Sequence, residues 1–163
     1  MKPNPFFYTF LLLAGLALSA CSTLNAGPLQ TESKVVELEG AESAQVEIQM
    51  SAGRLRIESG SRALLEGAFT YNIPEWRPET TYLVDGEVGQ LVIQQPAGIE
   101  ILPQRGVSVY DWNLRINDQV PISLSVNLGA GESFLFLGGL RLNDLIITTG
   151  VGNTTIDLSG NWQ

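Results

Sequence analysis

The sequence has no histidine and only one cysteine among its 163 residues. Without histidine, the chain lacks the commonest general base and the commonest side chain that binds metal ions. A single cysteine cannot form a disulfide within the chain, so strand pairing and burial must stabilise the fold even in an oxidising compartment. These two absences argue against much enzyme chemistry and against a disulfide-bonded scaffold.

Positive charge is also scarce, because 9 Lys and Arg residues stand against 17 Asp and Glu residues. Beyond Lys2 the chain keeps eight basic and seventeen acidic residues, a net charge of −9. No basic stripe remains. This balance argues against nucleic acid as a partner and against electrostatic docking on anionic lipid.

The N-terminus has the order of residues found in an export signal. Lys2 precedes an uncharged apolar run of thirteen residues, Phe6–Leu18, and small residues follow. The run is shorter than the about 20 residues of a membrane-spanning helix, but it fits the apolar centre of a signal peptide. We therefore expect residues 1–20 to be a cleavable signal.

Leu18, Ser19 and Ala20 directly precede Cys21, and this stretch resembles the lipobox of bacterial lipoproteins. The resemblance implies a diacylglycerol thioether on Cys21 and usually a third acyl chain on its amine. Two or more chains hold a protein stably on a bilayer. The alternatives are a buried cysteine behind an ordinary signal, or an N-terminal helix that is never cleaved. The spacing and the flanking residues favour the lipobox, with the membrane as a partner.

Residues 21–34 are expected to be the lipidated cysteine and a polar tether, and residues 35–163 a single domain. Ser22 follows the cysteine, where an Asp would be expected to retain a lipoprotein at the inner membrane. The outer membrane is therefore favoured if the cell has two membranes. The domain is expected to be extracytoplasmic.

The rest of the chain alternates between apolar and polar residues, as in Val46–Met50, Arg54–Ile57 and Ile122–Leu128. A period of two is typical of half-buried strands. Glycine, proline and Asn-Asp turns separate these segments. The segment Asp85–Gly89 predicts a hairpin with a longer loop. The sequence therefore predicts an all-β fold.

A repeat with a period near 20 residues is the most informative feature of the domain. Gly129-Ala130-Gly131 precedes Leu135 and Leu137, and 21 residues later Gly150-Val151-Gly152 precedes Ile156 and Leu158. Ser51-Ala52-Gly53, followed by Leu55 and Ile57, is a plausible third copy. The pattern favours a right-handed β-solenoid-like stack of short strands with glycine corners, and a β-sandwich is the alternative. Because the chain ends just after a repeat, either Trp162 covers the last coil or the sequence is a fragment, which we favour.

Four segments of the domain carry a family resemblance: Ala44–Gly53, Leu64–Asn72, Pro74–Pro78 and Val126–Gly131. With these segments the domain resembles the N-terminal toast-rack domain of bacterial envelope proteins. The resemblance implies an envelope-associated β-solenoid without established catalytic residues. It also implies similarity to adhesin-like solenoids and to the extracytoplasmic part of proteins that respond to cell-wall-active antibiotics.

The most distinctive local segment is Pro74–Pro78, in which two prolines fix the backbone around Trp76. Together with Tyr71, Glu75 and Arg77, this Trp is a candidate contact for a sugar ring or a protein partner. The alternative, which we favour, is that Trp76 packs as a cap over the first coil.

Other motifs carry little chemistry. The Gly-x-Gly segments open no helix and precede no Gly-Lys-Ser/Thr, so they predict strand corners and no phosphate site. Glu132-Ser133 and Asn153-Thr154 lack the regular aspartates of calcium-binding repeats. Asp111, Trp112 and Arg115 form the nearest approach to an active site, without a nucleophile–base pair. We expect no catalytic residues, no metal and no cofactor.

These observations lead to one hypothesis with two alternatives. The favoured function is a membrane-anchored, non-catalytic scaffold that binds an envelope partner, with a role in envelope stress among its uses. The first alternative is an adhesin-like module that binds glycans. The last is a carbohydrate-active enzyme.

Overall fold

The computed structural model describes residues 26–96 and 108–160. The expected signal, the lipobox, Cys21 and Trp162 lie outside these residues. Among the residues described, no helix has the length and apolar character that a membrane crossing needs. The elements are β1 (Gln30–Val36), β2 (Ser43–Ser61), β3 (Leu65–Tyr71), the 3-10 turn η2 (Pro74–Trp76), β4 (Glu79–Asp85), β5 (Val88–Gln94), β6 (Tyr110–Asn117), β7 (Pro121–Phe136) and β8 (Arg141–Asp157).

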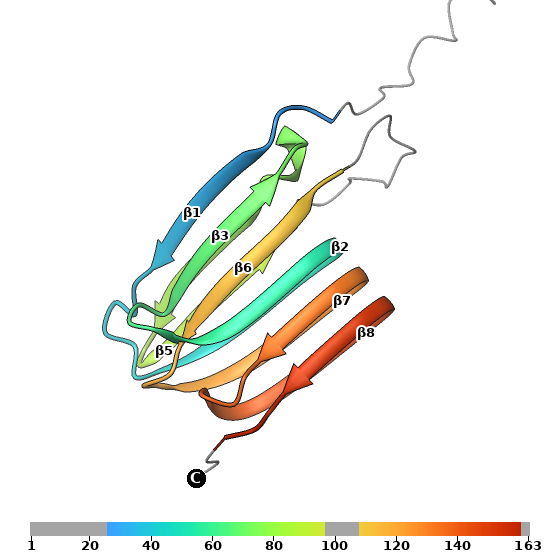
Figure 1. Cartoon of the computed structure of the whole chain (residues 1–163). Coiled ribbons are helices and arrows are strands. Elements are labelled where there is room, and N and C mark those ends of the chain that lie inside the picture. Colours follow the sequence, from blue (N-terminus) through green and yellow to red (C-terminus); the bar gives the residue numbers. More distant parts are fainter. Residues whose placement is uncertain (1–25, 97–107, 161–163) are drawn as a thin grey trace, which may run out of the picture.

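Strands β2, β7 and β8 are parallel coils stacked in one register (Figure 1). Gly53 lies opposite Gly131, and Gly131 lies opposite Gly152. The three copies of the repeat therefore coincide in space, which confirms the solenoid prediction. Within the copies, Ile57 aligns with Leu135, so the apolar pairs of the first copy are offset from those that the sequence suggested.

The glycine corners bend these strands without interrupting them. β2, β7 and β8 are 19, 16 and 17 residues long, where short strands were expected. Gly53, Gly131 and Gly152 have φ values of 147°, 132° and 139°, a region that L side chains rarely adopt. Each strand can turn there because its neighbours turn at the same residue and the ladder of pairs continues on both sides.

The bend divides the sheet into two arms. The first arm consists of residues 43–51, 121–129 and 141–150 of the coils, extended by β5 and β4. The second arm consists of the coil residues after the corner, extended by β6, β3 and β1. Because the bent coils join both arms into one sheet of eight strands, the β-sandwich alternative is wrong.

The core lies between the two arms and is filled by the inward residues of alternating strands. Ile48, Leu91 and Val126 come from the first arm, and Ile57 and Leu135 from the second, all at 1% exposure or less. Large aromatic rings fill the N-terminal part of the second arm, where Trp112 meets Phe69 edge-on with ring centroids 5.4 Å apart. Burial of these apolar rows replaces the missing disulfide as the source of stability.

Two predicted boundaries differ from the structure. The β4–β5 hairpin turns through Gly86 and Glu87 alone, because Gly86 has a φ of 61° and Val88 already pairs with Asp85. β1 begins at Gln30, inside the stretch expected to be a tether. Its polar residues are compatible with a strand because β1 is an edge strand that pairs only with β3 among the described residues and is mostly exposed.

Candidate functional site

Trp76, for which the sequence favoured a cap over a ligand contact, lies in the core. The residue is 7% exposed, and its ring meets that of Tyr110 at a centroid distance of 5.3 Å. Burial raises the pKa of Tyr110, since the phenolate would lose its hydration there. In this conformation the indole has no face available for a sugar ring. Glu75 is exposed on the same 3-10 turn.

Arg77 and Tyr71 meet on Glu32, a residue of β1. The Arg77 guanidinium donates from Nε to Glu32 Oε2 at 2.8 Å and from Nη2 to Oε1 at 2.7 Å. The Tyr71 hydroxyl donates to Oε2 at 3.4 Å. The hydrogen bond from Arg77 lowers the pKa of Glu32, and burial raises that of Tyr71. This cluster ties β1 to η2, so its charges are already engaged within the molecule.

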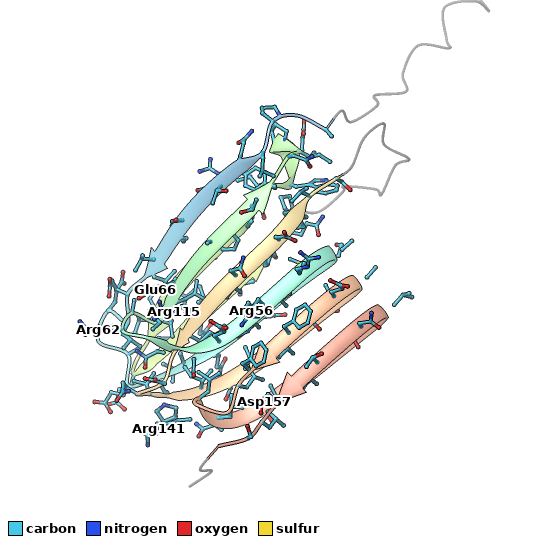
Figure 2. All side chains as sticks on the ribbon, viewed as in Figure 1. Arg56, Arg62, Glu66, Arg115, Arg141 and Asp157 are labelled. Carbon is cyan, nitrogen blue, oxygen red and sulfur yellow. The ribbon has the colours of Figure 1, made fainter. Side chains whose placement is uncertain are left out.

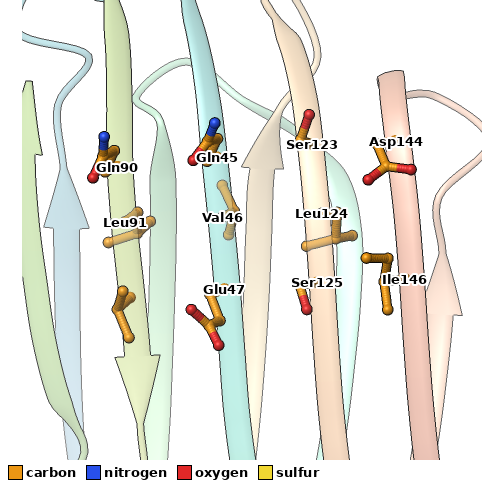
Figure 3. A pocket seen from close by; sticks show the side chains of 11 residues that line it. Gln45, Val46, Glu47, Gln90, Leu91, Ser123, Leu124, Ser125, Asp144 and Ile146 are labelled. Carbon is orange, nitrogen blue, oxygen red and sulfur yellow. The ribbon is translucent and has the colours of Figure 1, made fainter. Parts of the chain in front are cut away.

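A shallow groove of about 340 Å³ crosses the outer face of the first arm (Figure 3). Two rows of outward side chains line it, and each row takes one residue from each of four strands. The registers align the first row as Gln90, Gln45, Ser123 and Asp144, and the second as Val92, Glu47, Ser125 and Ile146. We call this the serine groove, because the small Ser123 and Ser125 leave the hollow over β7.

The serine groove combines groups that donate and accept hydrogen bonds. Gln45 and Gln90 supply amides, Ser123 supplies a hydroxyl, and Asp144 ends the row with a carboxylate. Adjacent strands lie about 4.8 Å apart, so consecutive polar groups repeat at that spacing across the groove. The arrangement suits an extended polar ligand that lies across the strands.

Two further features shape the second row of the groove. Gln49 donates from Nε2 to Glu47 Oε1 at 2.7 Å, which holds the Glu47 carboxylate in place. Ile146 is 54% exposed and gives the row an apolar end. The groove therefore offers both hydrogen bonds and a small apolar contact.

The outer face of the second arm carries a network of arginines and carboxylates (Figure 2). Arg115 Nη1 lies 3.3 Å from Glu66 Oε2, and Arg54 Nε lies 3.2 Å from Glu132 Oε2. The guanidinium carbon of Arg56 lies 4.7 Å from the centre of the Phe136 ring. Opposite charges thus pair along the whole face, and such exposed pairs contribute little each.

Asp111, Trp112 and Arg115, the nearest approach to an active site in the sequence, lie on opposite faces of β6. Asp111 lies 3.9 Å from Arg54, and Trp112 packs inward at 1% exposure, as expected. Glu132, which follows a glycine corner, is paired with Arg54. Among the described residues, no group of three or more Asp, Glu, Cys or His side chains could hold a metal ion.

The sequence identified the outward residues of β2 and β7 but missed their neighbours in the groove. Asp144 lies beside Ser123 because the two are one repeat apart, 21 residues in the chain. The same period, applied to every outward position, would have found this pair. Glu32 has no such signal, because 45 residues separate it from Arg77 and it belongs to no repeat.

A family model for the N-terminal domain of toast_rack, DUF2154, matches residues 25–163. The chain belongs to this family. Toast-rack domains were the resemblance that the strand and corner segments had carried, and the stacked, bent coils are the fold that the resemblance implied. No curated protein matches this toast-rack chain.

Among solved structures, the toast-rack domain is similar to a protein of Clostridium sporogenes ATCC 15579 that is provisionally described as a cell adhesion protein. The two share 32% sequence identity at a TM-score of 0.80, over 83% of this chain and 64% of that one. The chain thus spans less than two thirds of that relative. A provisionally described adhesin of Bacteroides fragilis NCTC 9343 matches at 11% identity and a TM-score of 0.37, over 80% of this chain and 63% of that one.

Proposed function

We propose that this toast-rack protein is a lipid-anchored scaffold on the outside of the cell membrane and that it binds an envelope partner through the serine groove. The groove carries the proposal, because it is a hollow on an open face whose polar groups repeat across four strands. The description of the Clostridium relative as a cell adhesion protein supports the same role.

Lipid attachment at Cys21 is the first part of the proposal, and the lipobox Leu18-Ser19-Ala20 supports it. A mass spectrum of the mature protein should show a chain that begins at Cys21 and carries at least two acyl groups. Cys21→Ser should move the protein from the membrane fraction to the soluble one, because no acyl chain then holds it. Recovery of an unmodified Cys21 with its leader attached would contradict the anchor.

Ser22 supports delivery to the outer membrane if the cell has two membranes. In that case Ser22→Asp should redirect the protein to the inner membrane, as judged by density-gradient separation of the membranes. A conservative Ser22→Thr variant is the matched control and should remain in the outer membrane.

A glycan is the second candidate partner, and we assign its binding to the serine groove instead of to Trp76. Sugar hydroxyls both donate and accept hydrogen bonds, as the amides of Gln45 and Gln90 do, and the Asp144 carboxylate accepts them. Polymers of the cell's own envelope and glycans of other cells would be screened on an array. Gln45→Ala and Asp144→Ala should each weaken binding at least tenfold, with Asn113→Ala on the second arm as the control. Equal binding by all three variants would remove the groove from the proposal.

An envelope-stress role is the finer function that the family resemblance implies. A strain without the protein would be treated with a cell-wall-active antibiotic, and the induction of envelope-stress genes would be measured. Reduced induction, restored by the wild-type chain and not by Gln45→Ala, would support this role. Catalysis is not part of the proposal. The chain has no histidine, and its sequence shows no nucleophile paired with a general base.

A further inference from the structure

The serine groove carries negative charge that no cation of the described residues neutralises. Glu47 and Asp144 are its charged residues, and neither lysine nor arginine lines it. Each ion pair between a carboxylate and an arginine in the described parts of the chain lies on the second arm or at η2, and neither groove carboxylate takes part in one. Arg141, at the start of β8, donates from Nη1 to the backbone oxygen of Gln119 at 2.8 Å. The groove lies on the outer face, so a further coil beside β8 would extend it without covering it.

The two carboxylates lie on opposite sides of the serines of β7 (Figure 3). Glu47 lies beside Ser125 in one row, and Asp144 lies beside Ser123 in the other. Two steps of about 4.8 Å across the strands and two residues of about 3.3 Å each along them put the two Cα atoms about 12 Å apart. One ammonium group cannot contact both carboxylates at this separation, so each of them needs a positive charge of its own.

The uncharged groups of the groove set a second condition on the ligand. Gln45, Gln90 and Ser123 offer donors and acceptors along the first row, and Ser125 offers both beside Glu47. A ligand that fills the groove must therefore exchange hydrogen bonds between its positive charges. A chain that carries hydroxyl groups as well as ammonium groups meets both conditions.

We infer that the serine groove binds a glycan chain whose sugars carry free amino groups. This inference rests on the proposed function, because it names the class of ligand for the same groove. The ammonium groups of the glycan contact Glu47 and Asp144, and its hydroxyl groups exchange hydrogen bonds with the amides and serines between them. Acetylated amino sugars lack the positive charge and therefore bind more weakly.

Other classes of ligand match the groove less well. An anionic polymer would meet two carboxylates and no cation, so like charges would oppose its binding. A protein partner would need large anchors such as Trp, Tyr or Arg in its contact surface, and none of these lines the groove. Among the described residues, the large apolar side chains exposed on this outer face are Leu83 and Ile146. Two such residues are a small apolar centre for a protein interface.

An oligomer of glucosamine that is long enough to span about 12 Å is the probe, and the fully N-acetylated oligomer of the same length is its control. Titration calorimetry with the full chain should show that the acetylated oligomer binds at least tenfold more weakly. Added salt should weaken the binding of the amino oligomer, because it screens exposed charges. The same salt should leave the binding of the acetylated oligomer almost unchanged.

Variants without the two charges test the contact residues. Glu47→Gln and Asp144→Asn should each weaken binding of the amino oligomer about threefold, and together about tenfold or more, since each exposed ion pair contributes modestly. The control is a double variant, Glu37→Gln with Glu75→Gln, which removes the same net charge from exposed positions outside the groove. It should leave binding within about twofold, because distant exposed charges are screened.

The possible outcomes separate this inference from the proposed function. Equal binding of the two oligomers, lost in Gln45→Ala, would overturn the inference and leave the groove as a glycan site. Binding of neither oligomer would also overturn it, and the glycan array would then decide whether another polymer occupies the groove. Equal losses in the groove and control variants would show attraction to the whole acidic molecule and no site. A lysine oligomer that binds as tightly as the amino sugars would show that the hydroxyl groups add nothing, and would remove the glycan from the inference.

Discussion

Gly131 occupies the middle corner of the solenoid, because it lies between Gly53 and Gly152 in adjacent coils. Its backbone approaches both neighbours so closely that only a hydrogen atom fits in place of a side chain. Gly131 therefore needs glycine for two reasons: its positive φ, and the close approach of the neighbouring backbone.

Gly131→Ala should lower the free energy of unfolding by about 3 kcal/mol or more, since the new Cβ meets a carbonyl oxygen and the residue keeps a positive φ. Gly60→Ala is the matched control. Gly60 has a φ of 102° but nothing within 4 Å of its Cβ position. Gly60→Ala should therefore lower the free energy of unfolding only by the about 1–2 kcal/mol that the strained backbone costs. Urea unfolding measures both losses. Equal losses would show that the close approach contributes nothing.

Glu32 provides a test of the cluster at the N-terminal edge. Its lowered pKa means that the folded state favours the carboxylate, mainly through the hydrogen bonds from Arg77. The contribution of Glu32 to the stability of the fold is therefore fully present above the ordinary pKa of 4.5. It is lost as the pH falls through the lower pKa that Glu32 has in the folded state.

Arg77→Gln should raise the pKa of Glu32 toward 4.5 in a titration followed by NMR of the carboxyl carbon. Arg62→Gln removes an arginine that makes no contribution to the Glu32 shift and should leave this pKa unchanged. If Arg77→Gln also left it unchanged, the hydrogen bonds would not be the cause of the shift.

At the scale of the element, the two last coils have the same pattern but different surroundings. Among the described residues, Leu135 of β7 has a coil on each side, while Ile156 of β8 has a coil on one side only. The benefit of burying an apolar side chain depends on the area removed from water, so the two positions should differ in stability.

Leu135→Ala should cost about 2–5 kcal/mol in urea unfolding, as in other well-packed cores. Ile156→Ala should cost less than about 1.5 kcal/mol, because the side chain is already partly in water. Equal costs without any ligand would mean that the last coil is covered in solution.

Period-two alternation, together with the repeat for the last coil, was sufficient to predict the coils and most of the other strands, because one side of each faces the core. It could not predict β1, whose residues are nearly all exposed and therefore show no alternation. It also gave no measure of strand length, since glycine corners usually end strands. Here the corners align between coils, and this alignment lets the strands continue through the bend.

At the scale of the whole molecule, most strand pairs join distant parts of the chain. Ala44 of β2 lies beside Ile122 of β7, whereas β4 and β5 form the one local hairpin among the described strands. The register of the coils follows from the repeat, but the positions of β1, β3 and β6 depend on contacts that no repeat encodes. For the same reason sequence reasoning missed Glu32 as the partner of Arg77, whereas the repeat was sufficient to predict the pair of Ser123 and Asp144.

Because non-local pairing must close long loops before it is stabilising, refolding should take milliseconds to seconds. Stopped-flow dilution from urea, followed by tryptophan fluorescence, would measure it through the buried Trp76 and Trp112. Refolding that is complete within the first tens of microseconds would contradict this view of the topology.

The order of the strands in the second arm also determines how the protein would carry tension. β1 and β8 lie at opposite ends of the arm, so a pull applied between them acts across the strands and along the hydrogen bonds (Figure 1). Bonds loaded in this direction open one after another, starting at the outermost strand. The bent coils oppose this peeling, because the same strand must also leave the other arm. Under such a load the domain would therefore open in small steps from either end, while the middle coils kept their shape.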